Sequence, residues 1–161
     1  MATENKGKRS PADIARRNAA KGAEFERDIM KRFNALAKTK AEALGVPVPK
    51  LPFFHRNRNQ AGYAGADINN PFGLQIECKN CAKIETEKWW QQVMTAARQY
   101  GGIPLVVWKV QGTRRIQAML PGTLYGGRMR GEKPMWSPVI IDETTLLEWV
   151  SHRIDVKFQQ K

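Results

Sequence analysis

The chain has 161 residues, of which 27 are Lys or Arg and 15 are Asp or Glu, so its formal net charge is +12. This length suits one domain with a sizeable core, and 42% hydrophobic with 26% charged residues excludes wholesale disorder. The longest apolar run, 104–108, is far too short to span a membrane, and the basic excess favours a polyanionic partner, above all nucleic acid.

The N-terminal third of the chain predicts a basic arm followed by a helix. We expect residues 1–9 to form a flexible basic arm and residues 10–161 to form a single domain. Ser10 can cap a helix, and the proline after it suits the first turn. Apolar residues recur at spacings of four and three through 23–44, which predicts a helix, and the glycine and prolines of 45–49 end it.

The rest of the chain alternates between strand and helix signals. In chain order the patterns predict strands over 51–55, 66–68 and 74–80, a helix over 85–100, strands over 104–110, 114–120 and 139–141, and a helix over 143–150. The order therefore begins αβββαβ. Because hairpins and a strand–helix–strand crossover both occur, we expect an α/β fold with a central mixed β-sheet flanked by helices.

One predicted hairpin brings charged residues together. Asp67 precedes its turn, and Glu77 and Lys79 lie on the strand after it. Alternate side chains of a strand share a face, so Glu77 and Lys79 are same-face neighbours. If the turn pairs Ile68 with Leu74, Asp67 lies diagonal to Glu77. That register would gather two carboxylates and one ammonium group in a small patch.

This patch suits a metal ion. Two carboxylates that converge are costly unless a cation lies between them, and magnesium prefers carboxylate oxygens and keeps several waters. Lys79 could then orient or help deprotonate a metal-bound water and offset charge on a phosphate. Taken alone, a Glu-x-Lys sequence on an exposed strand face is usually only an ion pair.

A third carboxylate belongs to Glu26, at the edge of the apolar stripe of the predicted 23–44 helix. An unpaired buried charge is expensive, so a glutamate there needs a partner. Glu26 either pairs with Lys79 or an arginine, or points over the sheet edge toward Asp67 and Glu77.

These residues resemble a known family. The segment 21–27 (Lys-Gly-Ala-Glu-Phe-Glu-Arg), then Asp67, then 77–79 (Glu-Cys-Lys), is similar to the PD-(D/E)XK nuclease superfamily. Within it, the likeness is closest to archaeal-type Holliday junction resolvases and their phage relatives, and it covers most of the chain. It departs from the usual pattern at Ala66, which replaces a proline before the aspartate.

The resemblance implies a restriction-endonuclease-like core and a metal-dependent endodeoxyribonuclease. By this resemblance Asp67 and Glu77 would bind Mg²⁺, with Mn²⁺ as a substitute, and Lys79 would be the catalytic lysine. Glu26 would complete the site through a second ion or a water. Phosphodiester hydrolysis by in-line attack of a metal-activated water would leave a 5′-phosphate.

A resolvase would cut four-way DNA junctions by paired symmetric nicks, which implies a two-fold homodimer. Candidates for its interface, and equally for plain core, are the apolar residues Leu146, Leu147, Trp149 and Val150. Two alternatives stay open: another nuclease of the same superfamily (restriction-like, nicking or repair), and a basic nucleic-acid-binding protein without chemistry. Converging carboxylates favour an enzyme, because a passive binder gains nothing from acidic groups in its basic face.

Several further side chains are candidates for contacts around this site. Related nucleases often place a glutamine nearby, and the predicted 85–100 helix offers Gln91 and Gln92. Candidates for contacts with DNA phosphates are Lys21, Arg27, Arg56, Arg58, Arg128 and Arg130.

Cys78 and Cys81 form a lone Cys-x-x-Cys motif. Zinc requires four ligands, and His55 and His152 show no ligand spacing, so we interpret Cys78 as an inward-facing strand residue. Two cysteines make no disulfide framework, and no apolar signal segment follows the charged residues 1–10, so we expect a cytoplasmic location, in the host if the source is viral. No Gly-rich phosphate-binding motif is present, and no nucleotide cofactor is expected.

Overall fold

The computed structural model describes residues 10–57, 66–122 and 137–160. The elements in chain order are α1 (Pro11–Ala43), β1 (His55–Arg56), β2 (Ile68–Asn69), β3 (Leu74–Cys81), α2 (Thr86–Tyr100), β4 (Ile103–Val110), β5 (Ile116–Gly122), β6 (Ser137–Asp142) and α3 (Glu143–Gln159). The order predicted from the sequence is confirmed, while the predicted basic arm lies outside the described residues. Among the helices that the structure describes, none has the length and apolar character of a membrane span.

α1 is a single helix that starts at Pro11 rather than Ala23. The predicted cap is confirmed, because the side-chain oxygen of Ser10 accepts a hydrogen bond from the main-chain N–H of Asp13 at 3.1 Å. Further along, Phe25 and Phe33 belong to a stripe of buried residues spaced by four. This stripe packs α1 against the sheet.

The strand predicted over 51–55 is wrong for most of its length, because only His55 belongs to β1. Asn34 on α1 supplies the physical reason. Its side chain donates to the carbonyl of Phe54 at 2.7 Å and accepts from the N–H of Phe54 at 2.9 Å. These bonds use the main-chain groups that a longer strand would have paired with a neighbour.

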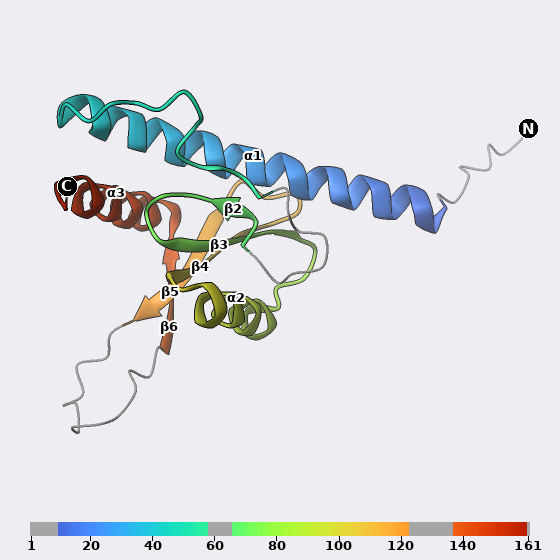
Figure 1. Ribbon diagram of the computed structural model, residues 1–161. Coiled ribbons are helices and arrows are strands. Elements are labelled where there is room, and N and C mark those ends of the chain that lie inside the picture. The colour runs from blue at the N-terminus through green and yellow to red at the C-terminus, as the bar shows by residue number, and fades with distance from the viewer. Residues whose placement is uncertain (1–9, 58–65, 123–136, 161) are drawn as a thin grey trace, which may run out of the picture.

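The six strands form one mixed sheet in the order β1-β2-β3-β4-β5-β6. β3 and β4 are parallel and joined through α2, and every other neighbouring pair is antiparallel. Figure 1 shows α1 and α3 on one face of the sheet and α2 on the other. This arrangement is the restriction-endonuclease-like α/β core that the sequence predicts.

Each face of the sheet has its own hydrophobic core. The larger core joins the sheet to α1 and α3 and contains Phe33, Ile76 and Leu105. The smaller core lies under α2, where Trp89 packs against Trp108 with ring centroids 6.0 Å apart. Because side chains alternate along a strand, the side chains of β3 that enter the larger core lie on one face of the sheet and its polar side chains lie on the other.

The register of the β2–β3 hairpin differs from the one assumed from the sequence. Ile68 pairs with Ile76, not with Leu74. The side chain of Asn70 causes the shift, since its oxygen accepts from the N–H groups of Phe72 and Leu74 and its nitrogen donates to the carbonyl of Leu74. These bonds close the turn on itself, so pairing begins two residues later along β3, and the side chain of Asp67 reaches the main-chain N–H of Cys78, next to Glu77.

α3 extends nine residues past its predicted end, from residue 150 to Gln159. Ile154 continues the buried stripe of Leu146 and Val150, and all three are 0% exposed. Of the two alternatives that the sequence left open for Leu146 and Val150, the structure shows core. Leu147 and Trp149 are partly buried against the same core.

Candidate active site

Glu77 lies at the centre of the candidate site, on the face of β3 that α2 covers. It is 4% exposed and is the one buried charged residue in the described ranges. Its Oε1 lies 2.5 Å from Nζ of Lys79 and accepts a hydrogen bond from Nε2 of Gln92 at 2.8 Å. Lys79 also donates to Oε1 of Gln92 at 3.3 Å. β3 and α2 thus hold this carboxylate from two sides.

Asp67, just before β2, is fixed to β3 by its side chain and its backbone. The N–H of Cys78 donates to Oδ2 of Asp67 at 2.7 Å, and the N–H of Asp67 donates to the carbonyl of Ile76 at 2.8 Å. Burial, and after it the charge of Asp67, raises the pKa of Glu77. The structure thus brings Asp67 to the residue that follows Glu77 on β3.

Glu26 approaches from α1, on the opposite face of the sheet. Its side chain is 12% exposed, and its Oε2 lies 2.9 Å from Nε of Arg56 on β1. Asp67 also acts on Glu26 electrostatically. Both sequence interpretations of Glu26 are thus partly correct, because it pairs with an arginine and also lies near the Asp67 carboxylate.

Burial and mutual repulsion shift the ionisation of both glutamates. Burial first, and then the charge of Asp67, raises the pKa of Glu77, while the bonds from Lys79 and Gln92 oppose the shift. The same two causes raise the pKa of Glu26, and the charge of Arg56 opposes them. The carboxylates of the site are therefore incompletely neutralised, and a bound cation would stabilise their ionised forms.

Cys78 lies near these carboxylates and contacts Asp67 through its main-chain N–H rather than through its thiol. Burial, followed by the charges of Asp67, Glu26 and Glu77, raises its pKa well above the ordinary value. A thiol held in this state is a poor nucleophile and a poor metal ligand. The interpretation of Cys78 as an inward-facing strand residue is confirmed by its 8% exposure.

The donor set of the site fits a hard divalent cation. Asp67 and Glu77 offer carboxylate oxygens, and magnesium typically takes one or two protein carboxylates while it keeps several waters. Within the described ranges no group of three or more His, Cys, Asp or Glu side chains is arranged to hold a metal. Glu26, paired with Arg56, is accordingly not assembled with the other two as a ready three-carboxylate site.

Of the two candidate glutamines, Gln92 faces the site. Its amide bridges Glu77 and Lys79. Gln91 is exposed, and its main-chain carbonyl accepts a hydrogen bond from the hydroxyl of Thr95. The sequence could not choose between them, because neighbouring helix positions differ by about 100° in direction.

The candidate phosphate contacts are scattered. Lys21 donates through Nζ to Gln111 at 3.1 Å, Arg27 is exposed beside Glu26, and Arg56 is paired with Glu26. The others, Arg58, Arg128 and Arg130, lie outside the described residues.

Two asparagines that the sequence analysis did not single out brace the site. Asn57 donates through its side chain to the carbonyl of Ala66 at 3.1 Å and through its main-chain N–H to the carbonyl of Asp67 at 2.9 Å. Asn80 donates to the carbonyl of Lys21 at 3.2 Å and so ties the end of β3 to α1. No local sequence signal marks such bonds, because both reach main-chain groups that only the folded chain brings near.

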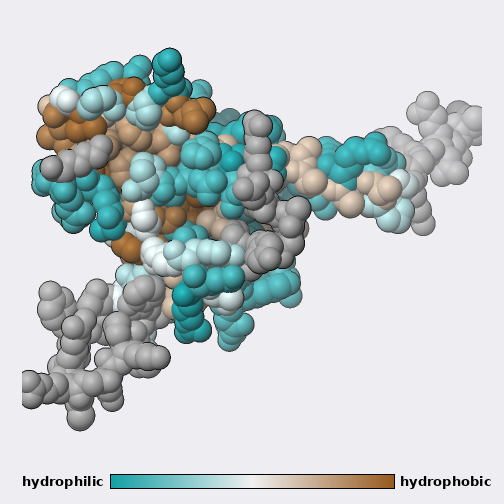
Figure 2. Space-filling view, in the orientation of Figure 1, coloured by the Kyte–Doolittle hydropathy of each residue, from teal (hydrophilic) through white to brown (hydrophobic). Residues whose placement is uncertain are grey.

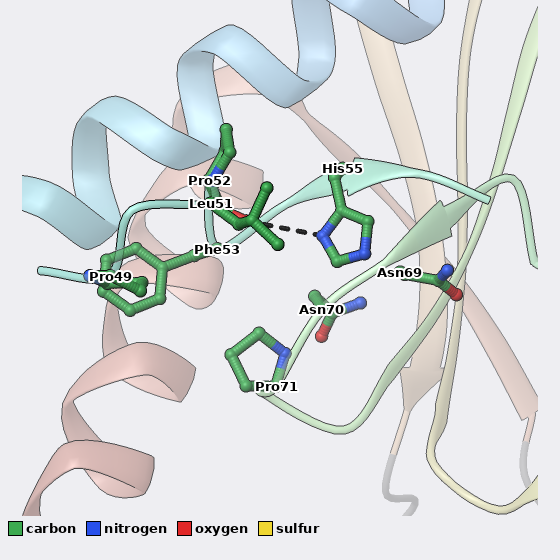
Figure 3. Close-up of a pocket in the computed structure, with 8 residues that line it drawn as sticks. All are labelled: Pro49, Leu51, Pro52, Phe53, His55, Asn69, Asn70 and Pro71. Atoms are coloured by element: carbon green, nitrogen blue, oxygen red, sulfur yellow. Dashed lines mark hydrogen bonds between the residues drawn. The ribbon is translucent and has the colours of Figure 1, made fainter. Parts of the chain in front are cut away.

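A separate hollow lies beside β1 (Figure 3). The residues that line it come from the segment before β1 and from the β2–β3 turn: Pro49, Leu51, Pro52, Phe53, His55, Asn69, Asn70 and Pro71. Nδ1 of His55 lies 3.4 Å from the carbonyl oxygen of Pro52. None of the lining residues carries a carboxylate or an ammonium group, so this hollow does not share the chemistry of the candidate site.

The chain matches a known protein family. A family model described as "Phage putative PDDEXK endonuclease" matches residues 17–155. No curated protein and no solved structure matches the chain. The matched span contains the four residues of the candidate site: Glu26, Asp67, Glu77 and Lys79.

Proposed function

Because the chain belongs to this family of phage PD-(D/E)XK endonucleases, we propose that it is a magnesium-dependent DNA endonuclease that cuts four-way junctions. The observation that carries the nuclease chemistry is the group formed by Asp67, Glu77 and Lys79, in which a buried glutamate is paired with the ammonium group of Lys79 and lies close enough to Asp67 to feel its charge. The preference for junctions rests on the resemblance of segment 21–27 to resolvases.

Each side chain of the site has a task in this proposal. Asp67 and Glu77 would hold the magnesium ion. When bound, the ion supplies Lewis acidity at a phosphoryl oxygen and lowers the pKa of a water. The ammonium group of Lys79 stabilises negative charge that develops on the phosphate, and Gln92 holds that ammonium in place.

Glu26 has a different role from the two metal-binding carboxylates. Its raised pKa makes its carboxylate a better proton acceptor than an ordinary glutamate. Held by Arg56, it can accept a proton from a water beside Asp67. Attack of that water oxygen on phosphorus with cleavage of the P–O3′ bond would leave a 5′-phosphate on one fragment and, once the leaving oxygen takes up a proton, a 3′-hydroxyl on the other.

The test compares a four-way junction with a linear duplex of the same arm sequences, each with magnesium, with manganese and with a chelator. We expect paired symmetric nicks in the junction, none with chelator, and none with Glu77→Gln. The matched control is Glu87→Gln, which makes the same change at an exposed position of α2 and should cut normally.

Three other outcomes would redirect the proposal. Equal cutting of the linear duplex would support a nuclease but exclude specificity for junctions. Cutting that persists in the chelator would exclude a metal requirement. Binding without cutting in any divalent ion would leave a nucleic-acid-binding protein.

A further inference from the structure

The N-terminal part of α1 leaves the body of the protein. Every residue from 11 to 20 is exposed, and partial burial begins at Lys21. Figure 1 shows this part, in dark blue, continuing the axis of α1 well past the end of the sheet, and Figure 2 shows it standing clear of the rest of the surface. We call residues 11–20 the projecting segment.

Within the described ranges, no residue of the projecting segment is buried, so packing against the described body of the protein contributes little to its stability. A helix of this length is marginal in water, because helices in proteins gain most of their stability from packing. Its sequence compensates, with a Ser10 cap, a proline in the first turn and good helix formers, namely Ala12, Ala15, Ala19 and Ala20. The sequence thus favours a stable helical rod whose residues are all exposed in the described part of the chain.

The charge of the rod is basic. Arg16 and Arg17 lie on it, and Lys21 continues the face of Arg17 one turn later. The single acidic residue, Asp13, lies 3.9 Å from Arg16 in a pair exposed on both sides, which contributes little. The alanines keep the rod thin, and a bare α-helix is the right width for the major groove of duplex DNA.

The rod is rigidly connected to the candidate site. The same helix carries Glu26, and Arg16 lies ten positions before it, about 15 Å along the axis at 1.5 Å per residue. Where α1 joins the body, Lys21 bonds to Gln111 and to Asn80, which fixes the direction of the rod. About 15 Å corresponds to roughly four or five base pairs of duplex.

We propose that the projecting segment is a duplex-binding extension that holds the DNA backbone roughly four or five base pairs from the phosphodiester being cut. This inference rests on the proposed function, since DNA is the substrate of the site. Charge complementarity favours duplex DNA as the occupant, because the segment presents two arginines, and its one large apolar side chain, Ile14, is too little for the apolar face that a protein partner would need.

The test is the double variant Arg16→Ala/Arg17→Ala, measured by fluorescence anisotropy on a duplex in chelator over a series of salt concentrations. Alanine preserves the helix, which circular dichroism checks. We expect binding about tenfold weaker at moderate salt, and a slope of log K against log salt reduced by about two, one for each arginine that no longer binds a phosphate. Backbone footprinting should show weaker protection about four or five base pairs from the cut.

The control is Lys31→Ala/Lys38→Ala, which removes the same charge from exposed positions farther along α1. Lys38 is paired with Glu42, just as Arg16 is paired with Asp13. Equally weakened binding in both double variants would overturn the inference, because net charge would then explain it. A change of oligomeric state in the arginine variant alone would overturn it in favour of a second copy as the occupant. Failure of the unaltered protein to cut DNA would count against the proposed function, and this binding comparison does not depend on cutting.

Discussion

Nε of Arg56 lies 2.9 Å from Oε2 of Glu26, so an arginine of the edge strand β1 neutralises a glutamate of α1 at the rim of the candidate site. The glutamate side chain is 12% exposed and the arginine side chain is 50% exposed. The pair links two elements that are far apart in sequence. Burial, and after it the charge of Asp67, raises the pKa of Glu26, and the charge of Arg56 opposes both effects.

Replacement of Arg56 by alanine should shift the pH dependence of cleavage. Arg56 lowers the pKa of Glu26, so its removal raises that pKa further. If Glu26 acts as a proton acceptor, the acid limb of the rate profile moves to higher pH. Single-turnover cleavage rates across a pH series measure this shift. Arg56→Lys keeps the charge and should keep most of the original profile, and an unmoved acid limb in Arg56→Ala would remove Glu26 as the acceptor.

Glu77→Gln should make the protein more stable at neutral pH while it abolishes cleavage. Burial and Asp67 raise the pKa of Glu77 in the folded state, so the folded protein binds this proton more tightly than the unfolded chain. The contribution of this proton to the free energy of unfolding is fully present below the pKa that Glu77 has in the unfolded chain, and it is lost as the pH rises through its pKa in the folded protein. Thermal unfolding in chelator at pH 8 should therefore show a higher midpoint for Glu77→Gln, by about 2–4 °C for each 1 kcal/mol.

The pH dependence of that stability difference is the stronger check. The gap between Glu77→Gln and the unaltered protein should close below about pH 4, where a glutamate is protonated in both states. Glu87→Gln, at an exposed position, should show no gap at any pH. A lower midpoint for Glu77→Gln at pH 8 would mean that the bonds from Lys79 and Gln92 outweigh burial and repulsion.

Gln92→Ala should slow cleavage by about tenfold and leave folding unchanged. Gln92 contacts both Glu77 and Lys79, and its removal leaves the ammonium group less well oriented. Its position on the helix surface means that the substitution opens no core cavity. The measurement is kcat against KM for cleavage, with the effect expected in kcat. Gln91→Ala, one residue away, is the control and should behave like the unaltered protein. A tenfold decrease there as well would indicate a general effect of α2.

Magnesium should stabilise the unaltered protein by mass action, because only the folded state gathers the two carboxylates. Thermal unfolding with a magnesium series should show a midpoint that rises with concentration. Asp67→Asn should abolish the rise, whereas Asp28→Asn, which alters an aspartate paired with Arg32 on α1, should retain it. A magnesium response that persists in Asp67→Asn would place the ion elsewhere.

The sequence by itself determined the order of the elements and named the candidates for the central site. Periodicity of four along α1 and alternation along β3 are local properties, so Phe25, Ile29 and the Glu77–Lys79 pair could be assigned to faces without a fold. The cap at Ser10 is likewise local. Such features depend only on neighbouring residues, which is why they were predictable.

Tertiary structure alone decided how the side chains of the candidate site are brought together. The Asn70 turn set the register that brought Asp67 toward Glu77, and Asn34 ended β1 early. Whether Glu26 met an arginine, and which glutamine reached Lys79, depended on how α1 and α2 pack on opposite faces of the sheet. These contacts join groups many residues apart, and no local pattern encodes them. The fold likewise decides where part of the positive charge of the composition lies, since it sets Arg16 and Arg17 on a projecting helix that also carries Glu26 of the candidate site.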